Sequence, residues 1–135
     1  MAHAYDLRVY YSDTDAGGIV YHARYLDFAE HARTELLRAF SDGRPGQMQV
    51  MRDRKLGFVV KSLSIEYHTP AFLDDALQVL TTIESAKRFS VTFLQRIMRS
   101  GEELATMQVR VASIDLDSHK PVPFEPWFAE AVATL

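Results

Sequence analysis

Residues 22–41 hold the clearest helical pattern of this chain of 135 residues, and everything else must fold around it. Their apolar side chains recur at steps of three and four residues: Tyr25, Phe28, Ala29, Ala32, Leu36, Leu37 and Phe40. Charged side chains lie mostly between them, so one face is apolar and the other is solvated. The apolar stripe is wide and aromatic. We therefore expect one deeply packed helix, ended by the turn-forming residues Ser41, Asp42, Gly43, Pro45 and Gly46.

The segments around this helix alternate with a period of two residues, which is typical of strands. Before the helix, residues 5–12 place Leu7, Val9 and Tyr11 on one face. After it, residues 47–54 can add a short helix before Gly57. Four further strands are then marked by Val59, Leu63, Ile65 and Tyr67; by Leu77, Val79 and Ile83; by Val91, Phe93 and Ile97; and by Met107, Val109 and Val111.

Two further patterns complete the fold prediction. In the last strand the apolar phase moves to Ala112, Ile114 and Leu116, which predicts a bulge or a change of buried face. Beyond the prolines of the tail, residues 124–135 follow helical spacing and predict a short amphipathic helix. Strands segregated from one long helix predict a single α+β domain over residues 1–135, with an antiparallel sheet wrapped around that helix.

The overall composition limits the possible functions. The net charge is -3 with a pI of about 5.9, whereas a nucleic-acid-binding domain is usually basic. There are no cysteines, which removes disulfides and thiolate chemistry and fits a reducing compartment. No run approaches the roughly 18 apolar residues of a membrane span, and no apolar signal core is present. We expect a cytoplasmic protein without a membrane span.

The stretch YSDTDAGGIVYHARY, residues 11–25, is the strongest candidate for a reaction site. A carboxylate there, Asp13 or Asp15, can attack an acyl carbon or take a proton from water. The adjacent pair Gly17 and Gly18 allows a substrate to approach the backbone closely. The alternative is an ordinary acidic turn, in which an aspartate only organises the backbone.

The residues after this turn can stabilise the negative charge that develops on the substrate carbonyl oxygen. Backbone N–H groups near Tyr21 and His22, at the predicted helix start, can stabilise an oxyanion. The side chain of His22 can also orient water, although a polar residue in a first helical turn is common. Glu30 lies eight positions further along and can face the same side of the helix as a supporting carboxylate, or simply belong to its polar face.

Other kinds of site have weaker support. The histidines at positions 3, 22, 31, 68 and 119 show no helical zinc spacing, so we predict no metal and no cofactor. No serine lies in a nucleophile elbow. Lys87 and Arg88, beside Phe89, can hold a phosphate of a nucleotide-bearing thioester, or be solvated loop charges.

The same stretch resembles the signature of the 4-hydroxybenzoyl-CoA thioesterase family, and most closely its bacterial branch encoded with the Tol–Pal envelope system. The matching residues are Arg8-Val9, Thr14-Asp15, Gly18-Ile19-Val20, His22 and Tyr25. The similarity continues through FVVKSLSIEYHTPAFLDD (58–75) and TFLQRI (92–97), so it covers most of the chain.

The resemblance implies a hotdog fold and hydrolysis of acyl-CoA thioesters to the free acid and CoA. It assigns the essential aspartate to Asp15, and the backbone N–H that polarises the thioester carbonyl to His22, whose side chain can also take part. Gly18 and Tyr21 would then contact the substrate, and Lys87 and Arg88 are positional assignments for the CoA phosphates. It also implies homodimers joined edge to edge, usually paired into homotetramers, with active sites between subunits.

Two alternatives remain open at this point. One is a hotdog enzyme that acts on acyl-carrier-protein thioesters, and the other is a non-catalytic acyl-binding or scaffold protein of the envelope machinery. A hydratase is a weaker reading, since such hotdog enzymes place their Asp-His pair in a different context. The acyl group is open as well, although four aromatic residues can shape its pocket: Phe28, Phe40, Phe58 and Phe89.

Overall fold

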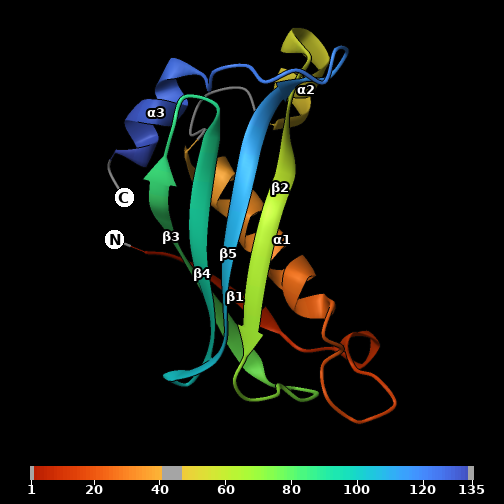
Figure 1. Ribbon diagram of the computed structural model, residues 1–135. Helices are drawn as coiled ribbons and strands as arrows, with labels where there is room; N and C mark the ends of the chain where they lie inside the picture. The colour runs from red at the N-terminus through yellow and green to blue at the C-terminus, as the bar shows by residue number, and fades with distance from the viewer. Residues whose placement is uncertain (1, 41–46, 134–135) are drawn as a thin grey trace.

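A computed structural model describes residues 2–40 and 47–133. In chain order the elements are β1 (His3–Arg8), a 3-10 turn (Tyr11–Asp13), α1 (Arg24–Phe40), α2 (Gln47–Arg54), β2 (Leu56–Tyr67), β3 (Ala76–Ala86), β4 (Ser90–Arg99), β5 (Glu102–Asp115) and α3 (Pro126–Val132). Figure 1 shows one sheet with α1 lying across its inner face. The predicted α+β class, with its one long helix and its order of strands, is confirmed.

The sheet has five strands in the order β1-β3-β4-β5-β2, and every pairing is antiparallel. The three consecutive strands β3, β4 and β5 form its centre, as expected for hairpin-connected neighbours. β1 and β2 are the two edges. The edge strand β2 is 12 residues long, and its outer side has no partner within the described chain.

The core forms where the apolar stripe of α1 meets the sheet. Tyr25, Phe28, Ala29, Ala32 and Leu36 are all buried, as their spacing predicts. They face inward-pointing residues of the central strands: Val79, Phe93, Ile97, Met107 and Val109. Fully burying one such side chain stabilises a fold by roughly 1.5–3 kcal/mol, so this contact fixes α1 against the sheet.

The boundaries next to the candidate site differ from the prediction. The first strand ends at Arg8, and Tyr11 lies in the 3-10 turn with 81% of its surface exposed. The long helix begins at Arg24, so His22 lies in a turn before it and not in its first turn. The predicted stop signals at 41–46 lie outside the described residues.

The irregularity predicted for the last strand lies opposite a register shift in the neighbouring strand β2. Lys61 is an additional residue of β2, placed between the partners of Val111 and Arg110. This shift also breaks the single buried face predicted for β2, where Val59 and Leu63 are exposed. In β5 three consecutive residues, 111–113, are buried and residues 114–116 are half-buried, so both faces are covered there and the buried face does not simply move to Ala112, Ile114 and Leu116.

The tail closes one end of the sheet. Phe128 of α3 is buried and stacks on Phe124 at 4.7 Å between ring centroids, and Phe40 meets its ring edge-on at 6.1 Å. The predicted short amphipathic helix is thus confirmed over Pro126–Val132. Among the helices of the described ranges, none is long and apolar enough to cross a membrane.

Candidate active site

Asp15 lies on a tight turn between the 3-10 turn and α1. Thr14 and Val20 form an isolated antiparallel bridge, and within it the Asp15 N–H donates to the carbonyl of Ile19 at 2.9 Å. The N–H of Gly18 donates back to the Asp15 carbonyl at 3.0 Å. Gly18 has φ +82°, a conformation that side-chain-bearing residues adopt at a cost. The turn therefore presents Asp15 at its exposed end.

Only one of the two oxygen atoms of the Asp15 carboxylate accepts a hydrogen bond within the described residues. Its Oδ1 atom accepts the N–H of Gly17 at 2.8 Å, and a Cβ at Gly17 would come within 3.1 Å of that oxygen. Within residues 2–40 and 47–133 no hydrogen bond or ion pair reaches its Oδ2 atom. One oxygen thus fixes the side chain, while the other is open to a substrate or a water molecule.

Gly18→Ala should lower the free energy of unfolding by about 1–2 kcal/mol, because alanine is strained at this φ. Gly17→Ala is the matched control, since its φ is not in the left-handed range and its methyl group would instead press on Asp15 Oδ1. Urea unfolding of both variants measures the difference. Equal losses of stability would contradict the assignment of strain to Gly18.

Asp13 has a different environment. Its side chain is buried and accepts the Tyr10 N–H at 2.8 Å and two donors of Arg24, Nε at 3.0 Å and Nη2 at 2.7 Å. The hydrogen bond to Asp13 is the main reason that the pKa of Arg24 lies above its usual value. Asp13 therefore ties the turn to the first residue of α1, and of the two aspartates only Asp15 is exposed.

The backbone before α1 offers unused donors. The Tyr21 N–H is occupied by the Asp13 carbonyl at 2.9 Å, and the Arg24 N–H donates to the Tyr21 carbonyl. Within the described part of the chain, the N–H groups of His22 and Ala23 donate to no protein acceptor. They stand at the positive end of a 17-residue helix, which suits an oxyanion. The predicted donor at His22 is thus unoccupied, whereas that of Tyr21 is not.

The hydroxyl groups of two tyrosines, Tyr67 and Tyr25, hold this backbone in place. The Tyr67 hydroxyl donates to the His22 carbonyl at 2.7 Å. The Tyr25 hydroxyl accepts the Ala71 N–H at 3.0 Å, and the Ala71 carbonyl accepts the Val20 N–H at 2.9 Å. Burial raises the pKa of both hydroxyls, so both stay protonated at neutral pH. In the sequence, the one signal for these bonds is that each tyrosine lies in an apolar pattern, since a buried tyrosine hydroxyl usually has a hydrogen-bond partner.

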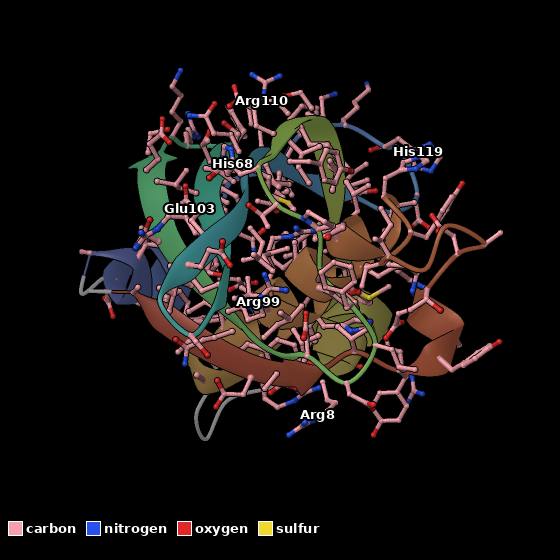
Figure 2. The ribbon with its side chains drawn as sticks, turned by 90° about the horizontal axis from the view of Figure 1, so that it is seen from below. Arg8, His68, Arg99, Glu103, Arg110 and His119 are labelled. Carbon is pink, nitrogen blue, oxygen red and sulfur yellow. The ribbon has the colours of Figure 1, made fainter. Side chains whose placement is uncertain are left out.

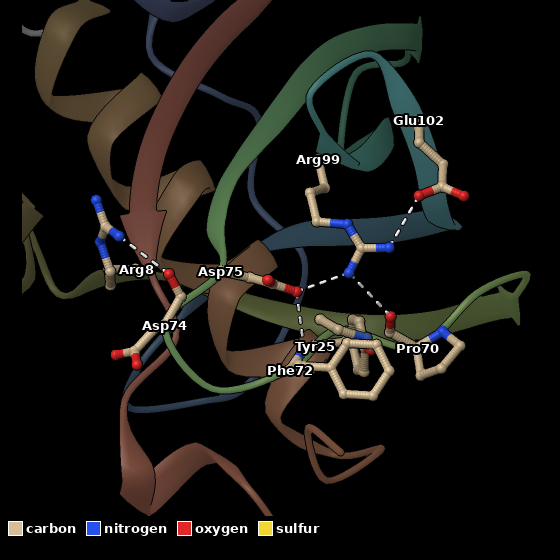
Figure 3. Close-up of polar contacts among 9 residues, drawn as sticks. Arg8, Tyr25, Pro70, Phe72, Asp74, Asp75, Arg99 and Glu102 are labelled. Atoms are coloured by element: carbon tan, nitrogen blue, oxygen red, sulfur yellow. Dashed lines mark hydrogen bonds and ion pairs between the residues drawn. The ribbon is translucent and has the colours of Figure 1, made fainter. Parts of the chain in front are cut away.

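Arg99 supports the same region from β4. Figure 3 shows its guanidinium between Asp75, the Pro70 carbonyl and Glu102, at 2.7, 3.2 and 2.9 Å. Its hydrogen bond to Asp75 is the largest cause of its raised pKa. The loop between β2 and β3 is thereby fixed to the β4–β5 hairpin, and this loop carries Ala71. Nothing in the local sequence pattern indicated this role.

The predicted phosphate-binding residues lie elsewhere in the chain. Lys87 and Arg88 are exposed in the β3–β4 connection, at the end of the sheet opposite the Asp15 turn (Figure 1). The 11 residues of β3 separate the two ends by roughly 35 Å. Arg88 lies over the ring of Phe89 at 5.2 Å. One chain alone therefore does not bring these cations to Asp15.

The remaining candidates are also dispersed. Glu30 is exposed, and its carboxylate accepts the Thr34 hydroxyl at 3.0 Å. In Figure 2 His68 lies near Glu103 while His119 lies apart from both. The described residues contain no cluster of three or more side chains that could hold a metal ion.

A cavity of about 190 Å³ lies between α1, the sheet and the tail. Of the four aromatic residues predicted to shape a pocket, Phe58 lines it. Phe28 belongs to the core, Phe40 packs on Phe128, and Phe89 is exposed on the β3–β4 connection. Phe93, Phe124 and Phe128 complete the aromatic lining instead.

A family model and two known proteins similar to this chain are all described as thioesterases or thioester hydrolases. The model of the thioesterase-like superfamily matches residues 9–132. An acyl-CoA thioesterase YbgC of Haemophilus influenzae is 47% identical over 121 residues, covering 90% of this chain and 87% of that protein. An acyl-CoA thioester hydrolase YbgC of Escherichia coli O6:H1 is 42% identical over 116 residues, covering 85% and 84%.

Solved structures agree with the fold. A probable thioesterase from Bartonella henselae is 33% identical, covers 93% of this chain and 100% of its own, and superimposes with a TM-score of 0.85. A 1,4-dihydroxy-2-naphthoyl-CoA thioesterase from Synechocystis, 24% identical, covers 100% and 98% with a TM-score of 0.90 and supports the fold alone. The predicted hotdog fold and the predicted enzyme class, a thioester hydrolase, are confirmed. The chain belongs to the thioesterase-like superfamily.

Proposed function

We propose that this protein hydrolyses acyl-CoA thioesters to the free carboxylic acid and CoA, with Asp15 as the catalytic carboxylate. The observation that carries the proposal is that one short segment, residues 14–23, holds both the open Oδ2 of Asp15 and the unoccupied N–H groups of His22 and Ala23. A nucleophile or base next to preorganised donors is what acyl transfer requires. The names of the YbgC relatives support the choice of acyl-CoA as substrate.

The chemistry follows from these groups. The thioester carbonyl oxygen would accept the free N–H groups before α1, which stabilise the negative charge of the tetrahedral intermediate. Asp15 would either attack the carbonyl carbon, forming an anhydride that water then cleaves, or take a proton from an attacking water molecule. In both routes the C–S bond breaks and CoA leaves as its thiolate. The His22 ring, 4.4 Å from that of Tyr21 between centroids, is exposed and can orient the water.

Release of free CoA from acyl-CoA by the purified protein tests the proposal. The same acyl group should be offered in parallel as an acyl-carrier-protein ester, because the carrier is the second candidate. Faster turnover of the CoA ester supports the proposal. Exclusive turnover of the carrier-protein ester, or tight binding of acyl-CoA without turnover, contradicts it.

We further propose that two copies join through their β2 edges. This edge exposes several apolar side chains, Phe58, Val59, Val60, Leu63 and Tyr67, each between 37% and 46% exposed. An unpaired apolar edge is a template for pairing with another strand. A second chain would enlarge the site and could bring its Lys87 and Arg88 toward the CoA phosphates, and pairing of dimers would give a tetramer.

Leu63→Glu should convert the dimer to a monomer, because two edge strands would then bring glutamates close together. Ala4→Glu, on the exposed part of the other edge strand β1, is the matched control and should leave the dimer intact. Light scattering after size-exclusion chromatography measures the mass. A Leu63→Glu protein that stays dimeric would rule out the β2 interface.

A cytoplasmic location and an association with the Tol–Pal system are also part of this proposal. The family resemblance of residues 8–25 supports both, and the absence of cysteine fits the reducing compartment of the first. Cell fractionation tests the location, and co-purification with Tol–Pal components tests the association.

A further inference from the structure

The cavity between α1 and the sheet has a mixed lining. Most of it is apolar, from Leu37, Phe58, Val60, Val91, Phe93, Val111, Phe124 and Phe128. Its polar lining comes from α1 alone, through Glu30, Arg33 and Thr34. An apolar cavity of about 150 Å³ can hold a benzene molecule. The volume here, about 190 Å³, is therefore enough for a small hydrocarbon body with one polar group.

Arg33 is the unusual member of this lining. It is partly buried, and its side chain makes one hydrogen bond within the described residues, from Nη1 to the Oε1 atom of Gln95 at 3.0 Å. Within the described ranges no carboxylate lies within ion-pair distance of it. Burial lowers the pKa of Arg33, and the more distant charge of Glu30 offsets this only in part. A partly buried cation with no carboxylate in contact has lost part of its hydration without gaining an ion pair, so this position favours an anionic ligand.

A second buried side chain fixes the direction of the guanidinium. Gln95 is fully buried, and its Nε2 donates to the Ala29 carbonyl at 2.9 Å and to the Thr81 hydroxyl at 3.0 Å. These two bonds use both amide protons and fix the orientation of the amide group. Its Oε1 atom therefore faces Arg33 and accepts the hydrogen bond from it. The guanidinium has five N–H donors, so most of them are left for a ligand. Glu30 does not compete closely, since it is exposed and bonded to Thr34.

We propose that this cavity binds a small monocarboxylate with an apolar body, whose carboxylate pairs with Arg33 and whose hydrocarbon part packs on the phenylalanine rings. The fork of a guanidinium matches a carboxylate in shape and charge. The phenylalanine rings of the lining offer an apolar surface for the hydrocarbon part. This inference does not rest on the proposed hydrolysis, because it concerns binding of a free acid near the middle of α1.

Calorimetric titration with heptanoate and its neutral counterpart heptanamide tests the proposal. Heptanoate should bind the wild-type protein at least about tenfold more tightly than heptanamide, given the usual strength of charge-assisted hydrogen bonds. Arg33→Met should weaken heptanoate binding by about 10- to 100-fold. Glu30→Gln should strengthen it, because a nearby negative charge is removed. Arg38→Met, which removes an exposed arginine of the same helix, is the matched control and should change nothing.

Two further measurements separate the outcomes. Asp15→Asn should bind heptanoate like the wild-type protein, so a failed hydrolysis proposal leaves this one standing. Heptanoate should also shift the Arg33 Nε resonance of the wild-type protein in a nitrogen-15 NMR spectrum, which decides the question if Arg33→Met does not fold. Equal affinity for heptanoate and heptanamide, unchanged binding in Arg33→Met, or an unmoved Arg33 resonance would each overturn the proposal.

Discussion

Asp15→Asn should lower kcat for acyl-CoA hydrolysis by about 1000-fold or more while leaving the unfolding temperature unchanged. Asparagine keeps the shape of the side chain and can still accept the Gly17 N–H through Oδ1, which lies at 2.8 Å in the wild-type protein. It can neither attack the thioester nor hold a proton. Loss of a general base or a nucleophile usually costs about 100- to 10,000-fold in rate.

The measurement is release of CoA thiol at saturating substrate, together with circular dichroism of both proteins. The exposed position of Asp15 makes the interpretation simple, because the substitution leaves the core untouched. Oxygen-18 from solvent water, followed in a single turnover, then tests for the anhydride route: label in Asp15 requires an anhydride that water cleaves at the Asp15 carbonyl, whereas a general-base route leaves Asp15 unlabelled. Turnover by Asp15→Asn within tenfold of wild type would exclude Asp15 as the catalytic group.

Asp13→Ala should instead destabilise the protein, by about 2–4 kcal/mol in free energy of unfolding. The substitution removes the acceptor of the Tyr10 N–H and the buried partner of Arg24. Breaking a buried ion pair from one side costs about 3–5 kcal/mol. The Arg24 side chain is 37% exposed, so part of its charge is solvated and the loss should be somewhat smaller.

Asp27→Ala is the matched control, because Asp27 also pairs with Arg24, at 2.9 Å, but its side chain is 51% exposed. Its loss should cost about 1 kcal/mol or less, as for other surface pairs near a helix start. Guanidinium unfolding of both variants makes the comparison. Similar losses for Asp13→Ala and Asp27→Ala would mean that the Asp13 contact does not anchor the helix start.

Hydrophobic periodicity predicted most of the fold. The stripe from Tyr25 to Leu36 located α1, and the alternation of the later segments located β3, β4 and β5, because burial on one face imposes those periods. The buried face of the edge strand β2 was harder to predict. An additional residue at Lys61 shifts its register, and its exposed side chains do not report which face is buried.

The start of α1 shows why local patterns do not determine a site. Asp13, eleven residues earlier, holds the side chain of Arg24, the first residue of the helix. The His22 carbonyl is held by Tyr67, 45 residues later. Such contacts depend on the assembled sheet and leave no periodic signal. The family resemblance pointed to Asp15 and His22, whereas the roles of Tyr67, Ala71 and Arg99 emerged only from the tertiary structure.

Steady-state release of CoA by the wild-type protein, with a panel of aromatic, short-chain and long-chain acyl-CoA esters, tests the proposed function most directly. We expect saturable turnover of at least one ester, lost in Asp15→Asn and retained in Arg38→Met. Binding of these esters without release of CoA from any of them would contradict the assignment of acyl-CoA hydrolysis to the Asp15 turn.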